Sequence, residues 1–88
     1  MTKQSIKSNL KNISDSYRAD NNNNSTLFYI NNMIEFFFVK IAVGGTFSGS
    51  IFCDCIRIDN DSEHIQFINN GKIISILNCT FIDEIQRR

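Results

Sequence analysis

The sequence predicts a small, mainly β domain of five bent strands, preceded by an amphipathic helix. Residues 33–85 form short apolar runs that are separated by tight-turn signals such as Gly44-Gly45 and Asn70-Gly71. The chain contains eight Phe and no Pro or Trp, and it is rich in Ile, a composition that favours a pleated, half-buried surface. Its 88 residues leave room for one domain.

An amphipathic helix is expected over residues 1–19. Its apolar face has spacings of four, three and four residues and consists of Ile6, Leu10, Ile13 and Tyr17. Thr2 or Ser5 can cap the start of the helix by accepting a backbone N–H bond. A helix of this length is marginal in water unless its apolar face docks on another surface, either the β domain or a partner.

A second stripe on the same helix is basic and consists of Lys3, Lys7 and Lys11. We interpret it as a solvated helix face, and a basic strip that contacts phosphate is the alternative.

The helix is followed by a predicted linker and then by the β domain. Residues 20–26 include four consecutive Asn, which compete with helical hydrogen bonding, and we expect a polar linker there. The β domain is expected over residues 27–88. It begins with a short β-like run at residues 27–30, ahead of the five expected strands, and Asn31-Asn32 is expected to form a hairpin turn.

Two long strands are expected next, at residues 33–43 and 46–58, joined by a turn at Gly44-Gly45. The second is too long to be straight, and we expect it to bend at Gly49. The remaining expected elements are strands at residues 64–68, 72–77 and 81–85, a hairpin at residues 69–71 and a one-turn 3₁₀ connector at residues 78–80.

This order of elements, together with the segment Phe47-Ser48-Gly49-Ser50-Ile51, resembles the Sm-like and Hfq-like superfamily of SH3-like small β-barrels. The resemblance implies a barrel and a ring of subunits. The RNA-binding motif residues of that superfamily are absent, because residues 52–57 lack its Asp and Asn pattern and residues 77–79 replace its Tyr-Lys-His. The resemblance therefore does not imply RNA binding through the family's own residues.

Charge and hydropathy argue against several classes of function. The formal net charge is zero, so strong non-specific binding to nucleic acid is not expected. The apolar run at residues 27–43 contains Glu35 and Lys40, which argues against a membrane span. The first twenty residues do not resemble a signal peptide, so we expect a cytoplasmic protein with reduced thiols.

No pattern of reactive side chains indicates catalysis or a metal site. Cys53, Cys55, Cys79 and His64 lack the paired spacing of zinc ligands, and we interpret the cysteines as small apolar core residues. None of them sits in a recognisable nucleophile–base signature, and no glycine-rich phosphate loop is present. We therefore expect no enzyme activity, no metal and no cofactor.

The aromatic residues exceed what one small core needs, and Phe36 and Phe37 point to opposite faces of one strand. A subunit interface together with a docked helix explains this excess. The more specific alternative is that nucleic-acid bases stack on exposed aromatic side chains beside basic residues. The candidate ligand-binding residues are Lys40, Arg57 and Lys72 for charge, with Phe52 and His64 for stacking. The competing interpretation is that Arg57 only pairs with Asp59 or Glu63.

The function expected from the sequence is a non-catalytic, oligomeric binding module whose ligand is RNA, a nucleotide or a protein. The alternatives are a small inhibitor of a host defence protein, encoded by a phage or mobile element, and a minor subunit of a larger assembly.

Overall fold

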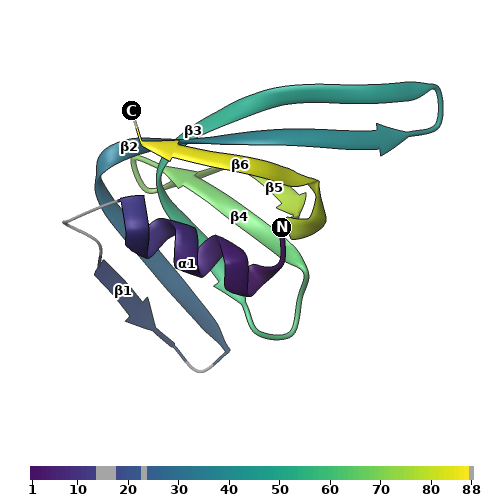
Figure 1. The fold of residues 1–88 in the computed structure, drawn as a ribbon. Helices are drawn as coiled ribbons and strands as arrows, with labels where there is room; N and C mark the ends of the chain where they lie inside the picture. The colour runs from purple at the N-terminus through teal and green to yellow at the C-terminus, as the bar shows by residue number, and fades with distance from the viewer. Residues whose placement is uncertain (14–17, 23, 88) are drawn as a thin grey trace.

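A computed structural model describes residues 1–13, 18–22 and 24–87, which form one α-helix, six strands and one 3₁₀ turn (Figure 1). The elements in chain order are α1 Lys3–Ile13, β1 Arg18–Asn21, β2 Ser25–Ala42, β3 Gly45–Asp59, β4 His64–Asn69, β5 Lys72–Asn78, η1 Cys79–Phe81 and β6 Ile82–Arg87. The strands form one curled antiparallel sheet of order β1-β2-β3-β4-β5, and β6 returns to pair with β2. The predicted mainly β class with an N-terminal helix is confirmed, with six strands instead of five.

The N-terminal helix is capped at a predicted residue and docks on the sheet through its predicted apolar face. The backbone N–H of Ser5 donates to Thr2 Oγ1 at 3.1 Å, which makes Thr2 the cap. Ile6 and Leu10 are fully buried, and the helix covers one side of the curled sheet (Figure 1). Burial of each such side chain contributes about 1.5–3 kcal/mol, so docking stabilises this short helix. Tyr17 lies outside the described residues.

A strand occupies part of the stretch expected to end the helix and form a linker. β1 pairs with the start of β2, from Arg18 opposite Tyr29 to Asn21 opposite Thr26. The hydroxyl of Thr26 donates to Asn21 Oδ1 at 2.9 Å. The structure thus differs from the expected linker over residues 20–26, because pairing with a neighbouring strand satisfies the backbone of even a polar, Asn-rich segment.

The prediction of a hairpin turn at Asn31-Asn32 is wrong, because β2 runs through both residues without a break. Both halves of β2 pair with β3, but residues 30–33 of β2 oppose only Asp54 of β3. These extra residues form a bulge, which bends a strand and increases its twist. The sharp bend therefore lies at this bulge and not at Gly49, where the sequence placed it.

Gly49 has a different role from the one expected. It lies in the regular part of β3 opposite Phe38. A Cβ atom on Gly49 would lie 3.1 Å from Phe38 Cζ, so the glycine makes room for an aromatic ring. The two glycine turns are as predicted, with a φ of +99° at Gly44 and +78° at Gly71.

The core lies between α1 and the inner face of the sheet. It consists of Ile6, Leu10, Phe28, Ile30, Ile34, Phe36, Cys53, Ile56, Ile58, Ile65, Phe67, Cys79, Ile82 and Ile85. The rings of Phe36 and Phe67 meet edge to face, with centroids 5.0 Å apart at an angle of 73°. The cysteines are free and buried, as expected of core thiols. Among the described residues, no helix has the length and apolar character needed to cross a membrane.

The distal halves of β2 and β3 leave the rest of the molecule as a two-stranded projection (Figure 1). We call residues 39–50 the arm and the remaining described residues the body. Every residue of the arm is exposed. The pairing of β6 with β2 ends at Phe38, so within the described residues no further strand pairs with β2 along the arm.

Candidate functional site

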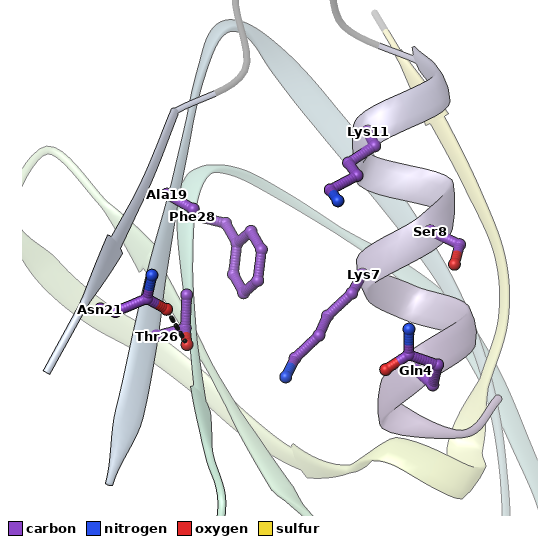
Figure 2. Close-up of a pocket in the computed structure, with 8 residues that line it drawn as sticks. All are labelled: Gln4, Lys7, Ser8, Lys11, Ala19, Asn21, Thr26 and Phe28. Atoms are coloured by element: carbon purple, nitrogen blue, oxygen red, sulfur yellow. Dashed lines mark hydrogen bonds between the residues drawn. The ribbon is translucent and has the colours of Figure 1, made fainter. Parts of the chain in front are cut away.

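A pocket of about 280 Å³ lies between α1 and the hairpin of β1 and β2 (Figure 2). The residues that line it are Gln4, Lys7, Ser8 and Lys11 of the helix and Ala19, Asn21, Thr26 and Phe28 of the strands. Phe28 and Ala19 provide an apolar wall, and none of the described residues that line the pocket is acidic. An apolar wall combined with a few placed polar and charged groups is typical of a ligand site, and this volume is at the small end of the usual range.

Two lysines give the pocket its charge. Lys7 and Lys11 lie one turn apart on α1, and their side chains extend toward the strands (Figure 2). Within the described part of the chain, neither ammonium group forms an ion pair with a carboxylate. Two like charges at this spacing destabilise a helix by about 0.2–0.5 kcal/mol, and a bound anion would relieve that repulsion.

The strand side of the pocket presents oriented polar groups. Asn21 Oδ1 accepts the bond from Thr26 Oγ1 at 2.9 Å. This bond occupies the amide oxygen and directs the amide Nδ2 donors to other partners. Together with the two ammonium groups, the pocket offers mainly hydrogen-bond donors, which suits an anionic ligand with oxygen acceptors.

The third lysine of the stripe is structural. Lys3 Nζ donates to the backbone oxygens of Asp59 at 3.1 Å and Asn60 at 3.0 Å, and it lies 3.8 Å from Glu63 Oε1. These bonds fasten the start of α1 to the turn between β3 and β4. The interpretation of the stripe as a merely solvated face therefore does not describe Lys3.

The cysteine thiols have the properties of packed core groups. Burial raises the pKa of the Cys53 thiol from 9.0 to about 12. Burial also raises the pKa of the Cys79 thiol, and Glu63, whose Oε2 accepts a bond from Cys79 Sγ at 3.1 Å, raises it further. Thiols held in the protonated form are poor nucleophiles. In the described residues, no group of three His, Cys, Asp or Glu side chains could hold a metal ion.

The five ligand-binding residues predicted from the sequence do not converge on one site. Lys40 lies in the arm, with Nζ 5.9 Å from the centre of the Phe81 ring. Phe52 lies opposite Glu35 in the body. Lys72 begins β5 at the hairpin turn, opposite Asn69 of β4.

The other two predicted residues, Arg57 and His64, flank the same turn. Arg57 Nε donates to Asp59 Oδ1 at 3.0 Å, so the ion pair named in the competing interpretation of this residue is present. The backbone N–H of His64 donates to Ser62 Oγ at 3.1 Å. Arg57 opposes Gln66, two residues along β4 from His64, so the two predicted side chains lie near each other on one face of the sheet.

The sequence showed the basic stripe to which Lys7 and Lys11 belong, but it did not predict that these lysines line a pocket. The signal was the repeat of Lys3, Lys7 and Lys11 at every fourth residue. The second wall of the pocket is the β1–β2 hairpin, which occupies the expected linker, so the sequence offered no partner for the basic stripe.

The fold and the pocket together define a class: a mainly β protein whose curled sheet and covering helix enclose a small cationic pocket. Comparison of the chain with protein-family models, with curated proteins and with solved structures finds no match.

Proposed function

We propose that this protein is a non-catalytic, self-associating binding module of the small-barrel kind, and that its ligand is a nucleotide, free or as part of RNA. The observation that carries the proposal is the cationic pocket, in which Lys7 and Lys11 lack an ion-pair partner among the described residues and stand beside the apolar wall of Phe28. A phosphate would bind the two ammonium groups, and the apolar wall would contact the sugar or base.

The size of the pocket supports a ligand of this scale. About 280 Å³ suits one phosphate-bearing group of the size of a single nucleotide, and it does not suit a folded protein surface. The small-barrel part of the proposal is supported by β6, which returns to pair with β2 after a 3₁₀ turn, in the order that an Sm-like barrel would have.

The test is to titrate the protein with adenosine monophosphate, with adenosine and with a short single-stranded RNA of mixed sequence. NMR chemical-shift changes and isothermal titration calorimetry measure the binding of each. We expect the nucleotide and the RNA to bind, adenosine to bind much more weakly, and affinity to fall as salt is raised. The double substitution Lys7→Met and Lys11→Met should weaken binding at least about ten-fold, because it removes two charge-assisted bonds.

The matched control is Lys72→Met, which removes an exposed lysine outside the pocket. It should leave binding unchanged. If Lys72→Met, Lys40→Met or Arg57→Met weakened binding while the Lys7 and Lys11 double variant did not, the sequence-predicted surface would be the site instead. Absence of binding by both phosphate-bearing probes would reject the proposed ligand class.

A further inference from the structure

The exposed apolar side chains of the molecule gather on two surfaces. Among the described residues, the exposed large hydrophobic side chains are Val39, Ile41, Val43, Phe47, Ile73, Ile74 and Ile76. The first four belong to the arm and the last three belong to β5. Exposed fractions of 77% for Ile41 and 57% for Phe47 are far above those of core residues. Concentrated exposed apolar surface indicates an interaction site.

The first surface, the arm, has an unpaired and unprotected backbone edge. In the described structure β3 pairs with β4 only from Cys55 to Ile58, so its preceding residues have no strand on that side. Natural edges are usually blunted by charged side chains or proline, yet residues 45–53 contain neither. A two-stranded hairpin is marginal alone in water, so this segment has the properties of a strand pair that a further strand completes.

The second surface, β5, is an edge strand as well. It pairs only with β4 in the described structure. Its single charged residue, Lys72, lies at its first position. The other edges differ, because β1 carries Asp20 and β6 carries Asp83 and Glu84, charges of the kind that discourage pairing with another chain.

We propose that the unpaired β3 edge of one copy of this chain, which runs along the arm and through the adjoining residues 51–53, pairs along the β5 edge of a second copy. The inference rests on the self-association included in the proposed function. It identifies the two surfaces that would form the contact between copies. Each chain has one arm and one β5 edge, so a second copy supplies the counterpart of both surfaces. Two chains related by a two-fold axis would make the contact twice, and chains that do not close in this way would form a ring or a linear array.

The charges at the two edges favour a second copy, because an antiparallel alignment of the edges can bring them together. An antiparallel alignment that opposes Ser48 with Ile76 also opposes Phe52 with Lys72. Lys72 then lies diagonal to Asp54, within reach of a long side chain. Neither Lys72 nor Asp54 forms an ion pair in the described part of the chain, so this contact would pair both. The same alignment covers the exposed side chain of Phe47 with Leu77.

The test uses one variant that disables the arm and one that disables the edge. Phe47→Glu places a charge on the arm, and Ile76→Glu places a charge on β5. Both residues are more than half exposed, at 57% and 51%, so neither change should unfold the body. Ser48→Glu, at an exposed β3 position that the alignment places opposite Ile76, provides a second arm variant, and Asn12→Glu, on the exposed face of α1, is the matched control for added charge. Melting curves establish that each variant is folded.

Light scattering and native mass spectrometry then measure the assembly state of each variant and of an equimolar mixture. We expect the parent chain and Asn12→Glu to associate, and each arm or edge variant to be monomeric. The mixture of Phe47→Glu with Ile76→Glu should form a one-to-one pair, because the intact arm of the second variant still meets the intact edge of the first. Contacts of arm with arm, or of edge with edge, cannot restore association in this mixture.

The outcomes separate this inference from the proposal on which it rests. A monomeric parent chain would reject self-association and the arm–edge contact together, and would leave nucleotide binding to its own test. A parent that associates while the mixture stays monomeric, at concentrations well above those at which the parent associates, would overturn the arm–edge contact alone. Association that persists in both single variants, or capture of a different protein by the arm in place of a second copy, would overturn it as well.

Discussion

The body and the arm are made of the same two strands, β2 and β3, and yet they bury their side chains in opposite ways. In the body, Phe36 of β2 is fully buried against Phe67. Further along the same face of the sheet, Phe47 of β3, which lies opposite Lys40 of β2, is 57% exposed. The pairing of β6 ends between them, and with it the packing that covers the inner face. The comparison indicates that the buried core of the molecule lies in the body and that the arm consists of exposed side chains.

The most severe test of this comparison is a pair of Phe substitutions. Phe36→Ala should destabilise the protein by about 3–5 kcal/mol, because it removes a buried ring and leaves a cavity. Phe47→Ala, in the arm, should change the stability of the monomer by less than about 0.5 kcal/mol. Urea denaturation at low protein concentration measures both. Equal losses for the two variants would show that the arm shares the core of the body.

A second test uses the buried thiol of the body. The folded state holds the pKa of Cys53 at about 12, above its ordinary value of 9.0, so the folded protein binds this proton more tightly than the unfolded chain. The stabilising contribution is complete below about pH 9 and is lost as pH rises toward 12, with a slope of at most about 1.4 kcal/mol per pH unit.

Cys53→Ala isolates this effect. We expect the variant to be less stable than the parent at neutral pH, because a buried side chain is shortened. The gap between the urea midpoints of the two proteins should narrow as pH is raised above about 9, since only the parent loses the contribution of the thiol. A gap that stays constant over that range would contradict the raised pKa.

The third test separates the two kinds of lysine on α1. Lys3→Met removes two bonds to backbone oxygens and should destabilise the body by about 1 kcal/mol without changing nucleotide binding. Lys7→Met should do the reverse, with stability unchanged within about 0.5 kcal/mol and nucleotide binding weakened. Melting curves and calorimetric titration of both variants read out the two properties. The division of roles fails if both substitutions affect the same property.

The smallest expected effect is in the arm. Gly49→Ala would place a Cβ 3.1 Å from Phe38 Cζ, so the ring has to move by a few tenths of an ångström. Alanine in a strand is favoured over glycine by about 0.5–1 kcal/mol, which offsets that strain. We expect a change in stability within about 0.5 kcal/mol by urea denaturation, because Phe38 lies at the edge of the core. A loss of several kcal/mol would indicate that the bend of β3 depends on Gly49.

Sequence reasoning succeeded where the physical cause is local in the chain. The apolar positions Ile6 and Leu10 follow from helical spacing, and their burial confirms the docked face. The turns at Gly44 and Gly71 follow from the freedom of glycine to adopt positive φ, and both are present. The ion pair of Arg57 with Asp59 joins residues two positions apart, and it was foreseen as one of two alternatives.

It failed where the cause is a contact between distant segments. The segment Arg18–Asn21 has little strand propensity of its own, and it forms β1 because it pairs with β2. The bulge at residues 30–33 exists because the two halves of β2 must pair with β3 on either side of Asp54. The five predicted ligand residues were chosen by type, and their positions in the sheet place Lys40 and Arg57 at separate sites.

The sequence by itself therefore determined the secondary-structure class, the docked face of the helix, the glycine turns and the burial of the thiols, since each depends on spacing or side-chain type. The tertiary structure alone decided which lysines line the pocket and where the sheet bends. It also decided that β2 continues beyond β6 into the arm. Each of these outcomes depends on which segments pair across the sheet, and one strand's sequence is compatible with several partners until the whole chain is packed.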